Sequence, residues 1–224
     1  GYDGSVRKWD VRSGRCLVVM TGHDGWVWSV DITKDGSIIY SAGQDGTVRK
    51  WNAHTGVLLL TMKGHEKDKD GDSEVWSVRI SADGNTLCSG GMDKTVRSWN
   101  STTGDVKMTM RGHTDAVRAV ALNGVGSLVY SGSEDESIRE WDVTSGVCLR
   151  TLLGHTDVVL SVCVSVDDKH LYSGSEDNTV GVWNLKDGSL VRRMEGHTNI
   201  VSSVCESPDG KIVSGSRDAT VKKW

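Results

Sequence analysis

Short apolar segments separated by glycine-containing turns follow one another along the whole chain. In residues 27–63 the apolar segments are VWSVDI, IIYSAG, VRKWN and LLLTMK, and KDGS, QDGT and HTGV separate them. The segments are rich in Val, Ile, Leu, Tyr and Trp, which favour strands, whereas Asp-Gly and Thr-Gly pairs favour tight turns. No segment keeps a helical spacing of apolar residues. The pattern predicts an all-β protein built from short antiparallel strands.

A fixed period organises these segments. Gly-His pairs recur at intervals of 42, 48, 42 and 42 residues, at 22–23, 64–65, 112–113, 154–155 and 196–197. Tryptophan recurs in step with them, at positions 9, 51, 99, 141, 183 and 224. The long interval contains an insertion, EKDKDGDSE, directly after His65. Repetition of this length, with four apolar segments per unit, predicts repeated four-stranded antiparallel sheets.

The repeated residues carry a family resemblance. Each unit has Gly-His, then Ser-Gly-Ser-x-Asp or a close variant, then Thr-Val-x-x-Trp or a close variant, with Asp or Asn after most of the tryptophans. This order resembles the WD-repeat family of β-propellers over essentially the whole chain. Asn52, Asn100 and Asn184 stand where the family usually has Asp, at a position that only shapes a turn. The resemblance implies four-stranded blades arranged around a central channel.

The strand pattern divides the chain, 1–224, into one propeller domain with incomplete blades at both ends. Residues 1–21 are expected to form the last two strands of a blade, and 196–224 three strands of another. Complete blades are expected at 22–63, 64–111, 112–153 and 154–195. We interpret this as a partial, five-repeat section of a larger propeller. The alternative is a closed five-bladed ring in which 17–21 pairs with 221–224 and the strand at 5–9 is surplus.

Each repeat also carries His, Ser and Asp at fixed offsets, the residue types of a hydrolase triad. Five copies of one active site are improbable, because catalysis needs one cleft with asymmetric surroundings. The resemblance implies instead a buried structural chain of hydrogen bonds from Trp through Ser and His to Asp. The expected tetrads are His23, Ser41, Asp45 and Trp51; His65, Ser89, Asp93 and Trp99; His113, Ser131, Asp135 and Trp141; His155, Ser173, Asp177 and Trp183; and His197, Ser214, Asp218 and Trp224.

The resemblance places partner contacts on the rim of the channel, three and five residues after each His and one residue before each tetrad Asp. The residues at these positions that we expect to bind partners are Trp26, Trp28, Gln44, Trp76, Met92, Arg118, Leu160 and Arg217. All three tryptophans outside the strand series fall on this rim. Clustered Trp and Met side chains are typical of interaction hot spots. Packing against the inserted loop or inside the channel is the alternative for these side chains.

The sequence thus predicts a non-enzymatic scaffold that binds proteins or peptides through its rim, as a subunit of a larger complex. A second reading is a receptor for phosphorylated peptides, because Arg118 and Arg217 resemble the rim arginines of F-box substrate receptors. A guanidinium group matches phosphate oxygens well. Glu134 and Glu176 lie at the same rim positions and would repel a phosphate.

Composition limits the partners, cellular location and cofactors that we expect for this protein. A net charge of −4 provides no broad basic surface, so no nucleic-acid partner is expected. No apolar run is long enough to insert in a membrane. The five cysteines form no metal-ligand spacing and recur at repeat positions, as small buried apolar residues do, which favours a reducing, intracellular and cytoplasmic location. Neither a metal nor a cofactor is expected.

The insertion Glu66–Glu74 leaves one question open. Asp68, Asp70 and Asp72 alternate as in a calcium-binding loop, but the full ligand spacing is missing. The alternatives are a solvated surface loop, a cation site and a docking point for a basic partner.

Overall fold

The computed structural model describes residues 1–66 and 73–224, and in them all regular structure is β-strand. The expectation of an all-β fold is confirmed. The strands are β1 (Ser5–Trp9), β2 (Cys16–Thr21), β3 (Val27–Ile32), β4 (Ile38–Gly43), β5 (Thr47–Asn52), β6 (Leu58–Lys63), β7 (Val75–Ile80), β8 (Leu87–Gly91), β9 (Thr95–Trp99), β10 (Val106–Arg111), β11 (Val117–Leu122), β12 (Leu128–Ser133), β13 (Ile138–Asp142), β14 (Cys148–Leu152), β15 (Val159–Val164), β16 (His170–Ser175), β17 (Val180–Asn184), β18 (Leu190–Met194), β19 (Val201–Glu206), β20 (Ile212–Ser216) and β21 (Val221–Lys223).

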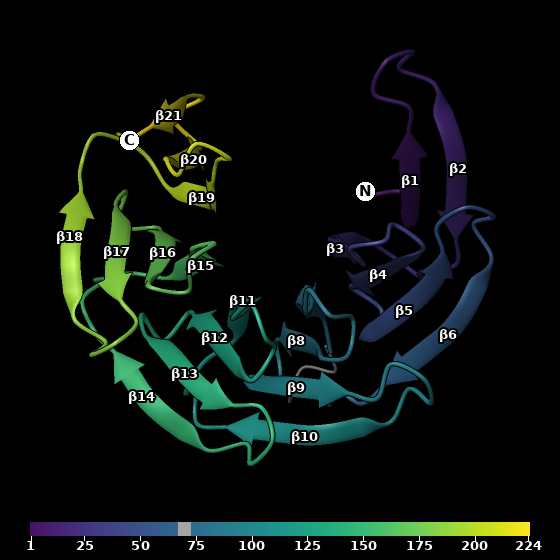
Figure 1. Ribbon diagram of the computed structural model, residues 1–224, viewed down its shortest axis with the longest axis horizontal. Helices are drawn as coiled ribbons and strands as arrows, with labels where there is room; N and C mark the ends of the chain where they lie inside the picture. Colours follow the sequence, from purple (N-terminus) through teal and green to yellow (C-terminus); the bar gives the residue numbers. More distant parts are fainter. Residues whose placement is uncertain (67–72) are drawn as a thin grey trace.

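Consecutive strands pair antiparallel, so that every sheet is a simple meander. Four sheets have four strands each, β3–β6, β7–β10, β11–β14 and β15–β18, while β1–β2 and β19–β21 form sheets of two and three strands. Figure 1 shows these sheets as blades of an open arc, with the first strand of each full blade near the centre and the last at the periphery. This architecture is that of a partial β-propeller.

The two ends of the arc do not pair with each other. Among the described residues β2 is hydrogen-bonded only to β1, and β21 only to β20. In Figure 1 the β1–β2 sheet and the β19–β21 sheet lie on opposite sides of the opening. The pairing of 17–21 with 221–224 that a five-bladed ring requires is therefore not formed.

The hydrophobic core lies between neighbouring blades. In one such cluster Val96 and Met110 of one blade pack with Val117, Val120 and the tryptophan of the next blade. A side chain in place of Gly90 would meet Val117 and Val120 at 2.5 and 3.0 Å, because the first strand of each blade packs closely on the second strand of the preceding blade. Close packing of this kind fixes the angle between blades.

The first strand of the first complete blade is less buried than the first strands of the next two blades. Val78 and Val120 are fully buried, but Val30 at the equivalent position of β3 is 51% exposed. In the described part of the chain, the sheet preceding β3 has only β1 and β2, which correspond to the last two strands of a full blade. No counterpart of a blade's second strand therefore covers Val30 there. Trp28 lies two residues earlier on the same strand.

The cysteines are not uniformly buried, which corrects the sequence-based expectation. Cys88 is buried, Cys148 and Cys163 are half-buried, and Cys16 and Cys205 are exposed. Cys16 opens the outer strand β2, and Cys205 lies on the terminal blade, whose next neighbour is not formed by the described residues. All five are free thiols. Within the described residues there is no helix that could cross a bilayer.

Candidate functional site

In every complete set the four expected tetrad residues form one hydrogen-bonded chain. In the first, Trp51 Nε1 donates to Ser41 Oγ over 2.8 Å, and His23 contacts Ser41 Oγ through Nε2 at 2.7 Å and Asp45 through Nδ1 at 3.0 Å. The same contacts recur in the other four sets, at 2.7–2.9 Å. Since the indole donates to Ser, the Ser hydroxyl donates to His, and the other His nitrogen donates to the carboxylate.

These chains are buried inside the blades. The five tetrad serines are fully buried and the five histidines are at most 8% exposed. The geometry resembles a Ser-His-Asp triad, but each serine hydroxyl is buried and accepts a hydrogen bond from the tryptophan of its set. Buried polar groups that satisfy one another fully add specificity to a core. The tetrads therefore act as structural ties within the blades.

Each tetrad Asp also fixes the rim. Burial by itself would raise the pKa of Asp45, but hydrogen bonds from His23, from Thr47 and from the backbone N–H of Asp24 outweigh it and hold this pKa well below its usual value. The charged carboxylate thus joins the loop before β3 to the turn between β4 and β5. Gln44, a predicted rim residue, directly precedes Asp45, so the hydrogen bonds of Asp45 also position Gln44.

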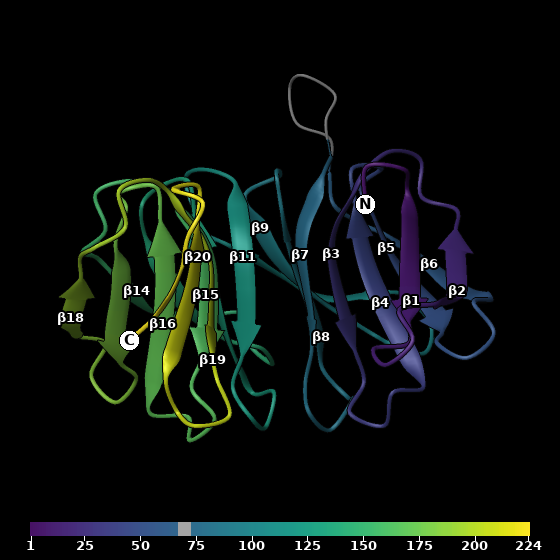
Figure 2. The same ribbon diagram turned by 90° about the horizontal axis from the view of Figure 1, so that it is seen from above.

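A β-bulge presents the second rim position in each blade. Val27 pairs with Gly43 and Ser29 with Ala42, which leaves Trp28 as the extra residue of β3. The register shifts at the same place in the other blades, so that the bulged residues are Trp76, Arg118, Leu160 and Ser202. A bulge re-aims a side chain and increases the local twist. The first strands of the blades begin at the upper edge of Figure 2, and the rim lies there.

An aromatic cluster occupies the rim at the N-terminal end of the arc. The rings of Trp26 and Trp28 lie edge to face with centroids 5.1 Å apart, and Tyr2 lies edge to face with Trp26 at 4.6 Å. Trp26 and Trp28 are 41% and 39% exposed, and Tyr2 is 77% exposed. Tyr2 was missed from the sequence. Asp3 lies six residues before Trp9, as Asp45 lies six residues before Trp51. Tyr2 precedes Asp3 as Gln44 precedes Asp45, so the repeat register could have found it.

Polar contacts connect this cluster to the next blade. Gln44 accepts from the backbone N–H of Trp26 over 3.2 Å and donates to Glu74 over 3.1 Å. The other oxygen of Glu74 accepts from Trp76 Nε1 over 2.8 Å. The rims of β3 and β7 are thus held together by a continuous chain of hydrogen bonds.

Trp76 is less accessible than the sequence suggested. The guanidinium of Arg118 lies 3.5 Å from the centroid of the Trp76 ring, and its Nε donates to Glu134 over 2.6 Å. Arg118 therefore covers the indole and is neutralised by a carboxylate. Met92 is only half-buried and belongs to the same blade as Trp76.

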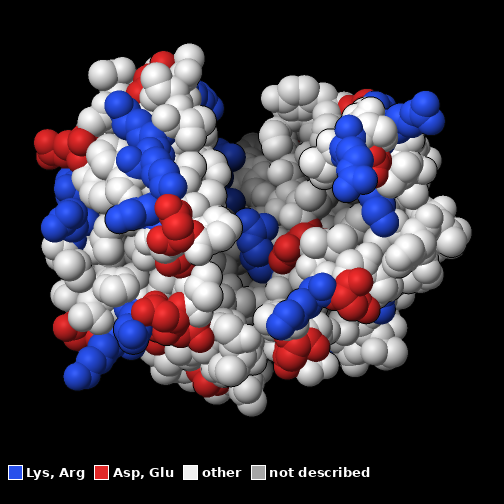
Figure 3. All heavy atoms as spheres, turned by 45° about the horizontal axis from the view of Figure 1, so that its top comes forward, with Lys and Arg blue, Asp and Glu red and all other residues white. Residues whose placement is uncertain are grey.

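The remaining predicted rim residues lie apart from this cluster. Leu160 is half-buried in the fourth complete blade. Arg217 is exposed in the three-stranded sheet β19–β21. Arg217 forms no ion pair within the described residues, and Arg118 lies two blades away. The structure thus does not bring the two arginines of the phosphopeptide reading together. Figure 3 shows a hollow at the centre of the arc, with both basic and acidic side chains on its walls.

The insertion is described only at its margins. Glu66 pairs with Arg111 at 2.9 Å, and Glu74 belongs to the rim network. Asp68, Asp70 and Asp72, the candidate cation ligands, lie outside the described residues. Among 1–66 and 73–224, no three His, Cys, Asp or Glu side chains are grouped so that they could hold a metal ion.

Comparison with protein families gives one result that covers most of the chain. The model of the WD domain, G-beta repeat (WD40) matches residues 14–52, 56–100, 104–142, 146–184 and 188–224. Each match spans the last strand of one sheet and the first three strands of the next, so every repeat contributes to two blades and joins them. No match to a curated protein was found. The chain belongs to the WD40 family of WD domain, G-beta repeat proteins.

Proposed function

We propose that this chain is a scaffold that binds protein partners through the rim around Trp26 and Trp28, as a non-enzymatic subunit of a larger assembly. WD40 repeats generally mediate protein–protein interaction and are generally non-enzymatic. The observation that carries the proposal is the exposed Tyr2–Trp26–Trp28 cluster. Contiguous exposed aromatic surface is unfavourable in water and typical of interaction sites.

Hydrogen bonds and β-bulges within the chain position the rim around this cluster. Gln44 and Glu74 hold the two neighbouring blades in register, and the bulges of β3 and β7 fix Trp28 and Trp76. A surface ordered in advance loses little side-chain entropy on binding. Met92 extends the same surface on the second blade, and Arg118 extends it on the third. Leu160 and Arg217 complete the proposed rim on the fourth and fifth blades.

The chemistry beside the cluster favours a partner with basic side chains. The insertion 66–74 has five acidic residues against two basic ones, and its first and last residues, Glu66 and Glu74, accept hydrogen bonds from Arg111 and Trp76. Cationic side chains bind favourably to the faces of indole rings and to nearby carboxylates. A phosphorylated partner is less well supported, since Arg118 is already paired with Glu134. The cytoplasm is the location that we propose for this interaction.

Quantitative affinity capture from a cell lysate tests this proposal. The wild-type chain, Trp28→Ala and Leu59→Ala serve as baits, because Leu59 is a similarly exposed apolar residue on the outer strand β6. We expect a set of proteins that is lost with Trp28→Ala and retained with Leu59→Ala. A set that is lost only with Leu59→Ala would move the interaction to the outer edge of the blades and overturn the rim assignment.

A binding measurement with one purified partner then gives the magnitude. Truncation of a central aromatic anchor typically weakens binding by about tenfold or more. We expect that loss for Trp28→Ala and no change for Leu59→Ala. An unchanged dissociation constant for Trp28→Ala contradicts the proposal.

A further inference from the structure

A pocket of about 300 Å³ lies between the second complete blade, β7–β10, and the third, β11–β14. We call it the junction pocket. Ser98 and Met108 line it from the second blade, and Val143 lines it from the third. Thr86 and Gly126, from the turns that follow β7 and β11, also line it. The junction pocket therefore lies at the ends of the strands opposite the rim.

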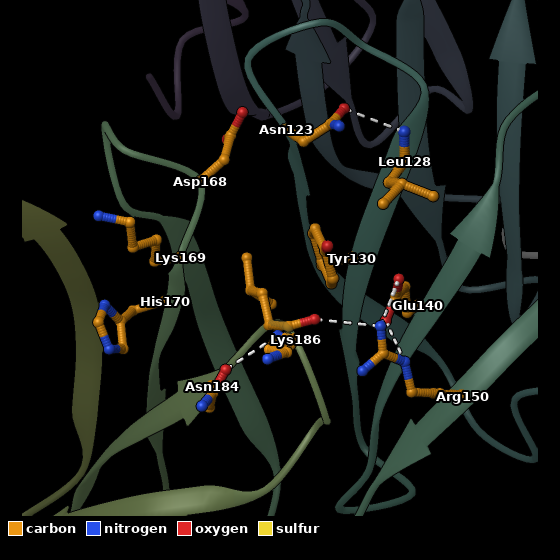
Figure 4. A pocket seen from close by; sticks show the side chains of 11 residues that line it. Asn123, Leu128, Tyr130, Glu140, Arg150, Asp168, Lys169, His170, Asn184 and Lys186 are labelled. Atoms are coloured by element: carbon orange, nitrogen blue, oxygen red, sulfur yellow. Dashed lines mark hydrogen bonds and ion pairs between the residues drawn. The ribbon is translucent and has the colours of Figure 1, made fainter.

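At three other junctions between blades, a cationic side chain crosses the equivalent space. It donates in each case to the carbonyl two residues after the tryptophan of the following blade. These hydrogen bonds join Lys8 to Ala53 over 3.2 Å, Lys50 to Ser101 over 2.8 Å and Arg150 to Leu185 over 3.0 Å. Figure 4 shows the groove at the last of these junctions, where dashed lines mark the contacts of Arg150. A bridge from a cation to a carbonyl thus joins most neighbouring blades here.

The junction pocket lacks this bridge. Ser98 directly precedes its tryptophan as Lys50 does, and Met108 stands on β10 where β14 has Arg150. The carbonyl equivalent to the acceptors at the other junctions belongs to Val143. Within the described residues, no side chain donates a hydrogen bond to it. The space that a Lys or Arg side chain crosses elsewhere is therefore open at this junction.

A second replacement adds to the open space. Cys88 pairs with Ser98 across the strands β8 and β9, so both side chains lie on the same face of the sheet. The residue before the tetrad serine is Tyr40, Tyr130 or Tyr172 in the other complete blades. Cys88 lacks the phenol ring that these residues place at the junction. Two neighbouring small side chains thus account for the pocket.

The hydroxyl of Ser98 points to a ligand. It has no hydrogen-bond partner within the described residues, although the side chain is only 2% exposed. A buried polar group without a partner costs free energy, so native structures almost always satisfy it. A water molecule occupies about 30 Å³ of liquid volume, which is far less than the junction pocket offers. The hydroxyls of Thr86 and Thr144 also belong to the lining.

The charges around the junction pocket favour a neutral polar group. Among the described residues, Lys107 is the one charged side chain of the lining, and it is exposed. The nearby carboxylates of Asp105 and Asp142 lie outside the lining and accept hydrogen bonds within their own turns. Lys107 would repel a cation. An anion would leave the carbonyl of Val143 without a donor and bring a negative charge beside it.

We propose that the junction pocket binds a primary carboxamide on a short apolar chain, in a small molecule or as a glutamine side chain of a partner. A carboxamide both donates and accepts. Its NH₂ group donates to the carbonyl of Val143, and its oxygen accepts from the hydroxyl of Ser98. The apolar chain packs on Met108 and on the ring of Trp99. This site is additional to the rim and does not depend on it.

Butyramide, butyrate and butylamine test the proposal, because they share an apolar chain and differ in the head group. Titration of the full chain, followed by ¹H–¹⁵N correlation spectra, measures their binding. We expect butyramide to shift the amide signals of Ser98, Met108 and Val143. It should bind at least about tenfold more tightly than either of the charged compounds.

A peptide distinguishes the two sources of the carboxamide. Acetyl-Ala-Gln-Ala-N-methylamide carries the carboxamide only on its glutamine side chain. Tighter binding than that of butyramide, with the same signals shifted, assigns the site to a partner protein. Weaker binding than that of butyramide assigns it to a small molecule. Both results require the same head group.

Four variants test the role of each group. Ser98→Ala should weaken the binding of butyramide by about fivefold or more without lowering the melting temperature, because the hydroxyl is unpaired in the free protein. Ser98→Lys introduces the residue type of Lys50 and should abolish binding. Lys107→Leu introduces the residue type of positions 17, 59 and 149, and should increase the affinity for butylamine relative to butyramide. Trp28→Ala, on the rim, should change neither affinity.

Three results overturn the proposal. Butyramide shifts no signals of the junction pocket, which is the result expected if the pocket holds only water. Butyrate or butylamine binds the wild type as tightly as butyramide does. Ser98→Ala and Ser98→Lys, with spectra that show a folded protein, bind butyramide as tightly as the wild type.

Discussion

Gly181 of β17 and Arg193 of β18 face each other across the strand pair, and Arg193 reaches the tetrad of that blade. Its Nη1 lies 3.6 Å from Asp177, and it donates to the carbonyl of Gly154. In two other blades, the arginine that contacts the tetrad Asp lies on the third strand of the blade instead of the fourth. Arg49 and Arg97 face Thr61 and Thr109, and contact their tetrad Asp at 3.1 and 2.9 Å. An exchange between paired strands thus retains the positive charge beside the carboxylate.

Replacement of Arg193 by Thr, the residue that the other complete blades have at this position, should therefore destabilise the protein. Asp177 and the Gly154 carbonyl each lose a partner, which costs about 1–2 kcal/mol for a partly exposed charged group. Urea unfolding measures this change. Arg192→Thr is the matched control, because the neighbouring Arg192 is exposed and makes no such contact. Equal unfolding midpoints for the two variants would contradict the assigned role.

His113→Ala should destabilise the third complete blade without affecting any binding surface directly. The substitution leaves Ser131 and Asp135 without their shared partner in a buried site, at a cost on the order of 1–3 kcal/mol. Thermal unfolding with His54→Ala as the control measures this, since His54 is an exposed turn residue. If His113→Ala melted like the wild type but lost partner binding, a structural role for the tetrads would be refuted.

The free energy of unfolding should decrease in two steps as the pH is lowered. His65 and Asp93 of the second tetrad contribute to these two steps. Burial lowers the pKa of His65 below its ordinary 6.5, although Asp93 opposes this. The unfolded chain therefore binds a proton that the folded protein does not, and stability is lost as pH falls below about 6.5. Burial raises the pKa of Asp93, but hydrogen bonds led by that from His65 outweigh it, so that this pKa lies below its ordinary 3.8.

The contribution of Asp93 is accordingly present above about pH 4 and is lost as the pH falls further. Unfolding free energies measured between pH 7 and pH 3 should show a smaller dependence on pH in Asp93→Asn than in the wild type below pH 4. Identical slopes in that range would show that the tetrad carboxylate is not the titrating group.

Trp28 and Trp76 occupy equivalent bulges but should respond differently to truncation. Trp76 donates to Glu74 and lies under Arg118, so Trp76→Ala should cost about 1–3 kcal/mol. Among the aromatic side chains of the described residues, Trp28 contacts only the exposed ring of Trp26, so Trp28→Ala should change the stability by about 1 kcal/mol or less. Differential scanning calorimetry compares the two, and a larger loss for Trp28→Ala would invalidate this assignment.

The free thiols should react in an order set by burial. Burial raises the pKa of Cys88 to about 12, which leaves almost no thiolate at neutral pH. Cys16 and Cys205 are exposed. Brief treatment with N-ethylmaleimide followed by peptide mass spectrometry should find label on Cys16 and Cys205 and none on Cys88 until denaturant is added. Early labelling of Cys88 in the folded protein would contradict the packing between the second and third complete blades.

The sequence alone determined the blades and the ties within them. The interval between Gly-His pairs, the alternation of apolar residues and the Asp-Gly turns are all local, so they predict strands and hairpins directly. The tetrad residues could be named for the same reason: their offsets repeat five times, and the structure brings each set together. Even Tyr2 could have been found, since it occupies the repeat position before Asp3.

Only the tertiary structure decided what the rim and the grooves present. Whether Trp76 is open or covered depends on Arg118, which lies 42 residues away at the equivalent position of the next blade, where the repeat does not fix the residue type. The exposure of Cys16 and Cys205 likewise depends on their place at the two ends of the arc, although their neighbours in sequence resemble those of Cys148 and Cys163. Side chains from different blades meet through packing and charge between sheets, and a period along the chain does not encode which of them will meet.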